Sequence, residues 1–205
     1  MKEYPILFKG EMVKAILGDR KTQTRRVIPN DLMMCLSPED EPEKFVEWCK
    51  YGAFGDRLWV RETWSPVPTS AYNVMVYDPN DPSVGAVHRA GWAVANPGTG
   101  WKPSIHMPRW ASRITLEITG VRVERVQDIC EEDAIAEGIE SCTDNLGQIH
   151  SNPTRLYMAF PERGGGFFRA RDAFECLWDS INAKRGVGWS ENPWVWVVTF
   201  KRLRS

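Results

Sequence analysis

The chain has 205 residues, and its 26 lysines and arginines against 27 aspartates and glutamates give a formal net charge of −1. Such a chain has no global field that attracts nucleic acid, so any electrostatic recognition must be local. The five cysteines form no C-x-x-C pair and the three histidines share no ligand-like spacing, which argues against a disulfide framework, a zinc site or another metal cofactor. No apolar run approaches the ~18 residues that span a membrane, so we expect a soluble cytoplasmic protein without membrane contact.

The first elements in chain order are a strand, a helix and a second strand. Residues 4–8 form a short apolar run, which predicts a buried strand. Residues 10–17 carry apolar side chains at helical spacing, and Gly18 suits the left-handed residue that follows a helix. Residues 22–28 are rich in β-branched side chains and predict an extended segment. Residues 19–21 therefore lie on a helix-to-strand connection.

The middle of the chain predicts one clear strand between two irregular stretches. Residues 30–56 are acidic and irregular, whereas residues 55–64 alternate as a strand does. The stretch 65–105 is rich in proline and glycine and contains short strand-like pieces at 72–77 and 86–90. We interpret this stretch as an insertion or a long flap.

The longest alternating segment, residues 113–126, predicts two paired strands or one continuous strand with a bend at Gly120. Residues 130–139 predict a short helix with acidic residues in its first turn, where the helix dipole favours them. Residues 141–165 are loop-like. An amphipathic helix at 170–186 follows.

A strand at 192–203 closes the chain. Strands interrupted by a few helices favour an α+β fold around a mostly antiparallel sheet or a small barrel. We expect one domain, residues 1–205, with insertions at about 30–54, 65–105 and 140–170.

The segment GDRKTQTRR, residues 18–26, concentrates positive charge, and six cations accompany two anions between residues 9 and 26. Like charges at this spacing lower the pKa of a lysine, which is one way to make Lys21 a base or a nucleophile. The hydroxyl of Thr24 can donate to a carbonyl or attack it. In a straight strand Lys21 and Thr24 would face opposite sides, so they converge only if the chain bends between them. The alternative is a solvated basic loop.

The strand DRLWVRETW predicts a second candidate surface. Arg57, Trp59 and Arg61 share one face, an arrangement that can bind a base and its phosphate but also stabilises ordinary sheets. Glu62 points to the other side, either half-buried against an arginine or as part of a site. Trp110 is a candidate for base stacking, with core packing as the alternative.

Four stretches together resemble an ASCH domain, and more closely the long version found in phages and prophages: AILGDRKTQTRR, GDRLWVRETW, RITLEITGVRVERVQDICEEDAIAEGI and NPWVWVVTFKRL. The most specific element is the segment from Gly18 to Arg25, which contains the pattern Arg-Lys-Thr-x-Thr-Arg. The resemblance implies a PUA-like fold, which is a small β-barrel with flanking helices that binds RNA or modified bases.

The resemblance also implies an activity, because small bacterial ASCH proteins include metal-independent amidohydrolases that deacylate N4-acetylcytidine with a lysine, a threonine and a glutamate. The matching residues here are Lys21, Thr24 and Glu137; without the resemblance, a lone glutamate at a helix end such as Glu137 is an ordinary surface residue. Lys21 would be the base or nucleophile, Thr24 would bond the tetrahedral oxygen or relay a proton, and Glu137 would protonate the leaving amine.

The expected ligand is a nucleoside, RNA or a modified nucleic acid. The candidate substrate-binding residues are Arg20, Arg25, Arg26, Arg57, Trp59, Arg61, Glu62 and Trp110. The alternatives to catalysis on an amide are a non-catalytic module that binds RNA or a modified base, a ribonuclease that uses the same basic pocket, and a structural or virion role.

Overall fold

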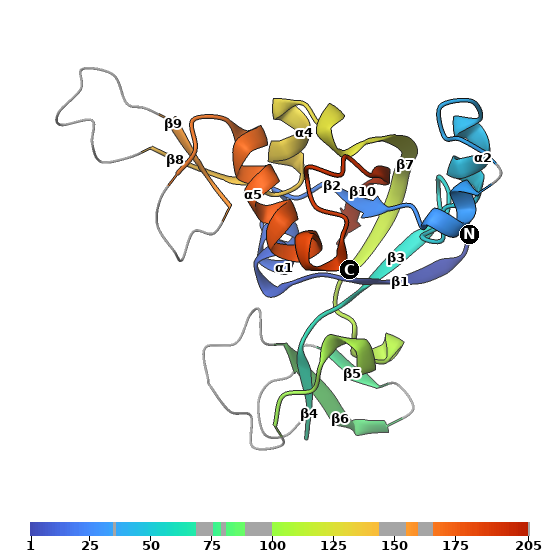
Figure 1. The fold of residues 1–205 in the computed structure, drawn as a ribbon. Helices are drawn as coiled ribbons and strands as arrows, with labels where there is room; N and C mark the ends of the chain where they lie inside the picture. Colours follow the sequence, from blue (N-terminus) through green and yellow to red (C-terminus); the bar gives the residue numbers. More distant parts are fainter. Residues whose placement is uncertain are drawn as a thin grey trace. The chain divides into compact units, whose positions relative to one another are not determined.

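The computed structural model describes residues 1–34, 36–68, 76–78, 81–88, 100–143, 155–159 and 166–204. The chain forms two compact units that interleave in sequence. Unit 1 consists of Met1–Asp19, Lys50–Gly120 and Phe200–Ser205, and unit 2 consists of Arg20–Cys49 and Val121–Thr199. Figure 1 labels their elements. The prediction of a single domain with three insertions stays a prediction.

The described elements are mainly short strands with a few helices. The strands are β1 (Glu3–Leu7), β2 (Gln23–Val27), β3 (Arg57–Arg61), β4 (Trp64–Pro68), β5 (Val76–Asp78), β6 (Asp81–His88), β7 (Thr115–Arg125), β8 (Glu140–Thr143), β9 (Arg155–Met158) and β10 (Trp194–Leu203). The α-helices are α1 (Gly10–Leu17), α2 (Pro42–Glu47), α4 (Glu131–Ala136) and α5 (Ala170–Asn182). In this part of the chain, no helix has the length and apolarity to cross a membrane.

The main sheet has the hydrogen-bonding order β1-β3-β7-β10-β2, and β7 and β10 each contribute residues to both units. β1 pairs with β3 in parallel, whereas β3–β7 and β10–β2 are antiparallel. Two small antiparallel sheets, β4-β6-β5 and β8-β9, complete the pairing. The α+β class with a mostly antiparallel sheet is therefore confirmed. Within the described ranges no pairing closes the main sheet, and the barrel implied by the resemblance stays a prediction.

In unit 1 the alternation of β3 follows the sequence prediction. Leu58 and Val60 are fully buried, whereas the intervening side chains of the strand are half-buried. Helix α1 ends as expected at Leu17, but the expectation for Gly18 is wrong: its φ is −86°, and Asp19 takes the left-handed conformation with φ 56°. Aspartate tolerates this conformation better than most residues.

In unit 2 the core lies between α5 and β10. Helix α5 presents Phe174 and Trp178 to Val195 and Val197, which are fully buried on β10. Helix α4 contributes Ala134 to this core, and the Glu131 carboxylate accepts hydrogen bonds from the first backbone N–H groups of α5. The apolar stripe of α5 and the short helix α4 are as predicted.

Two stretches interpreted as irregular contain regular structure. Residues 30–56 include α2, which starts at Pro42 and buries Phe45 completely. The indole N–H of Trp196 donates to the Phe45 carbonyl oxygen at 2.6 Å, so a tertiary contact stabilises a helix that propensity does not predict. Within 141–165, β8 pairs with β9. The 113–126 segment is one continuous strand, β7.

Several sequence predictions fall partly or wholly outside the described residues. These are the strand-like piece at 72–77, which the structure describes only from residue 76, the end of 86–90, Cys35 and His150.

Candidate active site

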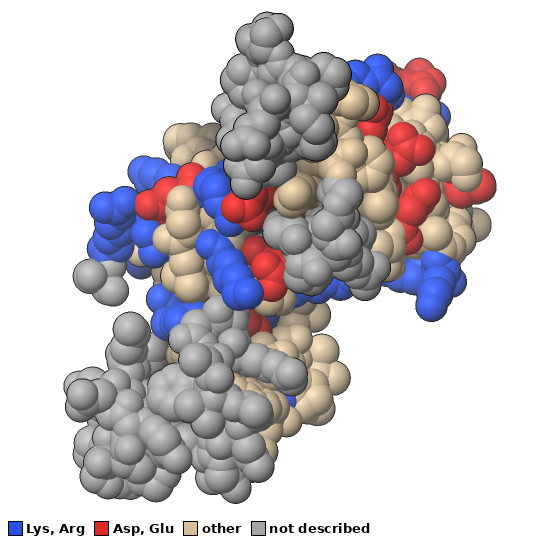
Figure 2. Space-filling view, turned by 90° about the vertical axis from the view of Figure 1, so that its left-hand side faces the viewer, with Lys and Arg blue, Asp and Glu red and all other residues tan. Residues whose placement is uncertain are grey.

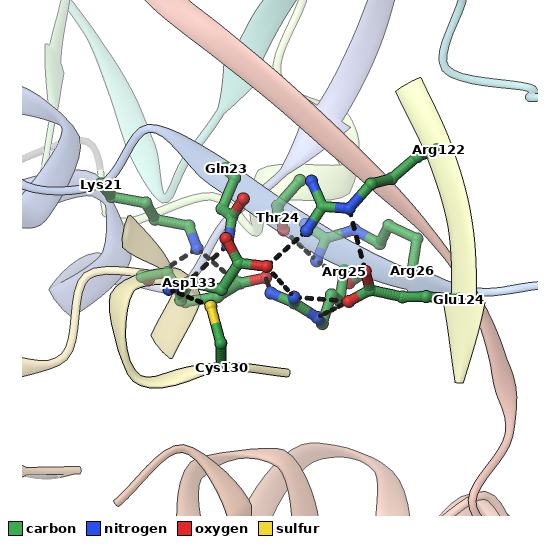
Figure 3. Close-up of polar contacts among 10 residues, drawn as sticks. Lys21, Gln23, Thr24, Arg25, Arg26, Arg122, Glu124, Cys130 and Asp133 are labelled. Atoms are coloured by element: carbon green, nitrogen blue, oxygen red, sulfur yellow. Dashed lines mark hydrogen bonds and ion pairs between the residues drawn. The ribbon is translucent and has the colours of Figure 1, made fainter. Parts of the chain in front are cut away.

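The residues around the start of β2 divide between two faces of the chain. Lys21, Gln23 and Arg25 all contact α4 or the residue that follows it, because alternate side chains of an extended segment share a face. Thr24 and Arg26 alternate with Gln23 and Arg25 along β2, and the Arg26 side chain binds that of Thr24 (Figure 3).

Lys21 and Glu137 form a buried ion pair. The Lys21 Nζ donates to the Glu137 Oε2 at 2.6 Å and to the Glu137 backbone oxygen at 2.7 Å. The side chains are 0% and 4% exposed, respectively. Burial lowers the pKa of Lys21 below its ordinary value; Glu137 opposes this effect, and the neighbouring guanidinium groups of Arg26 and Arg25 add to it. The site thus contains an amine that is easier to deprotonate than a surface lysine.

The local fold at the end of α4 explains why a glutamate lies there. Glu137 caps the C-terminus of α4, where the helix dipole disfavours a negative charge. Two neighbouring cations compensate this cost. The backbone N–H of Thr22 donates to the Ala136 oxygen at 2.8 Å, which fixes the segment before β2 against the end of the helix. Gly138, with φ 95°, then turns the chain away.

Arg25 binds three carboxylates, and its side chain is fully buried. Its Nη1 donates to the Glu137 Oε1 at 3.2 Å, and its Nη2 donates to the Asp133 Oδ2 at 2.7 Å. Its Nε and Nη2 both donate to the Glu124 Oε1, at 3.0 and 2.5 Å. Although burial alone would lower the pKa of Arg25, Glu137 and Glu124 raise it. The guanidinium is therefore permanently charged in this site.

Arg122 contacts the outer side of the same cluster. It donates to Glu124 Oε2 at 2.9 Å and to Asp133 Oδ2, and its side chain is 42% exposed. Two arginines thus share two carboxylates, as Figure 3 shows. Burial acts to raise the pKa of Asp133, but the hydrogen bond from Arg25 and the charge of Arg122 lower it below its ordinary value.

Acidic side chains, most of them from other elements, match much of the positive charge of the 9–26 segment. Lys14 pairs with Glu11, and Arg20 lies 3.5 Å from Glu140. Together with the pairs of Lys21 and Arg25, these contacts occupy four of the six cations. Basic and acidic side chains also lie interspersed on the face drawn in Figure 2.

Thr24 is buried, and its hydroxyl oxygen accepts a hydrogen bond from Arg26 Nη1 at 2.8 Å. Arg26 also donates to the Arg25 backbone oxygen at 3.1 Å. The structure therefore brings Lys21 and Glu137 together, and it binds Thr24 to Arg26, whose charge also acts on Lys21.

The remaining candidates belong to unit 1. The guanidinium of Arg61 lies 5.2 Å from the centre of the Trp59 ring and donates to the Met107 oxygen at 3.1 Å, whereas Arg57 Nε is buried without a hydrogen bond. Trp110 packs edge-on against Trp64 at 5.7 Å between ring centres.

Glu62, 2% exposed, receives two hydrogen bonds from Arg113, at 2.9 and 3.0 Å. His88 is buried in the same unit, and its Nε2 donates to the Ala111 oxygen at 2.7 Å. Burial lowers the pKa of His88, and Arg113 acts in the same direction, against the opposing charge of Glu62. The Glu62–Arg113 ion pair corresponds to the first of the two alternatives that the sequence left open for Glu62, burial against an arginine.

Sequence reasoning missed Arg122, Glu124 and Asp133. The alternation of β7 puts Arg122 and Glu124 on one face, and the acids of α4 were attributed to the helix dipole alone. In the part of the chain that the structure describes, no three His, Cys, Asp or Glu side chains are grouped as metal ligands.

Comparison of the chain with protein-family models, with curated proteins and with solved structures found no match.

Proposed function

We propose that this protein hydrolyses the N-acyl amide of a modified nucleoside, of which N4-acetylcytidine is the representative, and that Lys21 and Glu137 are its catalytic pair. The observation that carries the proposal is the buried contact of 2.6 Å between Lys21 Nζ and Glu137 Oε2. A general base needs a pKa near the working pH, and burial lowers the pKa of Lys21 in that direction. The PUA-like barrel implied by the ASCH resemblance is part of this proposal.

The chemistry follows from sharing one proton between the two groups. A neutral Lys21 takes a proton from water, and the resulting hydroxide adds to the acyl carbon. A protonated Glu137 gives its proton to the amide nitrogen, the C–N bond breaks, and a carboxylic acid and a free amine leave. Lys21 then returns its proton to Glu137 across their contact, which restores the pair. No step requires a metal ion.

The role of Thr24 is a separate part of the proposal. Its hydroxyl oxygen accepts from Arg26, and a hydroxyl that accepts one bond still has a proton to donate to an oxyanion. A Thr24→Val variant removes that proton and keeps the shape of the side chain. Its rate shows whether the hydroxyl acts with the pair or only packs in β2.

The test is incubation of the purified protein with N4-acetylcytidine and measurement of the cytidine and acetate released. We expect turnover by the wild type and losses of about 10²–10⁴-fold in Lys21→Met and Glu137→Gln, the range for general acid–base groups. Arg169→Gln is the matched control, because Arg169 is an exposed residue of the same unit that pairs with Asp172.

Absence of cytidine with the wild type, or full activity in Lys21→Met, would overturn the proposal. Binding of the nucleoside without turnover would instead indicate the non-catalytic module. An RNA that carries the same modified base, tested in parallel, distinguishes a nucleoside substrate from a polynucleotide.

A further inference from the structure

We propose that Arg25 is a positioning residue for the Lys21–Glu137 pair: it holds one oxygen of the Glu137 carboxylate so that the other faces Lys21. This inference rests on the proposed function for its kinetic part. Its electrostatic part concerns the ion pair itself and can be measured without substrate.

The division of the Glu137 carboxylate is the main observation. Oε1 accepts from Arg25 Nη1 at 3.2 Å, and Oε2 accepts from Lys21 Nζ at 2.6 Å. With each oxygen bound to a different cation, rotation of the carboxylate would break both contacts. A proton shuttle needs this fixed geometry, because a displacement of about 1 Å can cost about 10²-fold in rate.

Arg25 is itself held rigidly. All three nitrogens of its guanidinium donate to carboxylates, and no part of its side chain is exposed. Its guanidinium carbon also lies 5.7 Å from the centre of the Phe174 ring on α5. Arg122 binds Glu124 and Asp133 from the exposed side, so these two carboxylates are fixed from both sides.

The same contacts argue against a role for Arg25 in holding a substrate phosphate. A phosphate would have to displace a carboxylate from a side chain that is fully buried. Arg25 therefore acts through Glu137. Among the described residues, the charges that act most strongly on Lys21 are those of Glu137, at the end of α4, and of Arg26 and Arg25, on β2.

This arrangement predicts the sign of the effect on Lys21. Removal of the Arg25 charge removes its repulsion of the protonated Lys21. It also removes the Arg25 bond to Glu137, so that this carboxylate interacts more strongly with Lys21. Both changes favour the protonated amine. In Arg25→Gln the pKa of Lys21 rises. Arg25→Lys keeps the charge but has no planar guanidinium to bind several carboxylates. In this variant the pKa of Lys21 should therefore lie close to the wild-type value, whereas kcat should recover only in part.

The experiment combines two measurements. The first is an NMR titration of protein with ¹³C-labelled lysine, in which the Lys21 signal is identified by its loss in Lys21→Met. The second is the pH profile of kcat and KM with N4-acetylcytidine. We expect Arg25→Gln to move the Lys21 titration and the matching limb of the profile to higher pH, and to lower kcat about 10–100-fold with little change in KM.

Controls separate this effect from a general loss of structure. Arg169→Gln removes an exposed arginine of the same unit and should change neither measurement. Arg122→Gln removes the outer cation and leaves the Arg25–Glu137 contact, so it should have a smaller effect than Arg25→Gln.

The outcomes are distinguishable. A wild type that titrates as expected but releases no cytidine overturns the proposed function and leaves the electrostatic role of Arg25 standing. An unchanged Lys21 titration in Arg25→Gln overturns that role. A raised KM with an unchanged kcat identifies Arg25 as a substrate-binding residue instead. If Arg25→Gln does not fold, the Lys21 titration and the pH profile of kcat are measured on Arg25→Lys instead. A kcat of Arg25→Lys equal to that of the wild type overturns the inference.

Discussion

The buried Lys21–Glu137 pair allows a prediction about which of the two substitutions, Glu137→Gln or Lys21→Met, lowers the free energy of unfolding more. In Glu137→Gln, Lys21 keeps its fully buried position but loses the carboxylate 2.6 Å away, and Arg25 and Arg26 remain nearby. Removal of one partner from a buried pair costs about 3–5 kcal/mol, because an uncompensated charge stays in the interior. In Lys21→Met, Glu137 keeps its bond from Arg25 at 3.2 Å. We expect this variant to cost less, about 1–3 kcal/mol, the penalty for lost hydrogen bonds.

The pH dependence of the Glu137→Gln loss follows from the pKa of Lys21. Burial lowers this pKa below the ordinary value of 10.5, and Glu137 is the group that opposes the shift, so the pKa falls further in the variant. Between the folded-state pKa and 10.5 the unfolded chain binds more protons than the folded chain, so stability rises with pH in this window. Glu137→Gln should therefore recover part of its lost stability as the solution becomes alkaline.

The assay is urea unfolding followed by tryptophan fluorescence between pH 6 and pH 10, with the free energy of unfolding taken from the midpoint and slope. Lys21→Met, which has no amine at this position, is the control for the pH dependence. A Glu137→Gln protein within about 1 kcal/mol of the wild type at pH 7, below the range for a buried pair, would refute the reasoning. A larger cost for Lys21→Met than for Glu137→Gln would refute it as well.

Three further predictions concern stability. Because the folded-state pKa of His88 is lowered, the wild type should lose stability as the pH falls from 6.5 towards that pKa, and His88→Gln should flatten this part of the curve in urea unfolding at pH 7 and pH 5. Trp196→Phe should lower the free energy of unfolding by about 1–3 kcal/mol, because the Phe45 carbonyl loses a buried donor; a thermal midpoint equal to that of the wild type would contradict this. Glu131→Ala removes the cap of α5 and should cost about 1 kcal/mol by chemical unfolding, with Glu131→Gln retaining part of the capping.

Local pattern accounts for much of the fold. The alternation of β3 and β7 and the apolar stripe of α5 are decided by neighbours within a few residues, and these elements are where the sequence predicts them. Helix α2 and the β8–β9 pair are different. The Phe45 carbonyl accepts a hydrogen bond from Trp196, 151 residues away, and no short-range pattern contains that information.

The candidate site divides in the same way. The sequence predicts that Lys21 and Thr24 converge only if the chain bends between them; in the structure Lys21 binds Glu137, and Thr24 binds Arg26. It also predicts a local excess of positive charge. The carboxylates that bind Lys21 and Arg25 lie 99 to 116 positions further along the chain, and no spacing rule links them to these two cations. Charge at one segment therefore says little about the charge of the folded site.

This long separation has a consequence for synthesis of the chain. Lys21 leaves the ribosome 116 residues before Glu137, which at about 5–20 residues per second is a delay of roughly 6–23 s. During that time the basic segment is a short polycation whose principal counter-charges have not been made. Folding of unit 2 then buries Lys21 and Arg25 beside the acids of β7 and of the α4 segment.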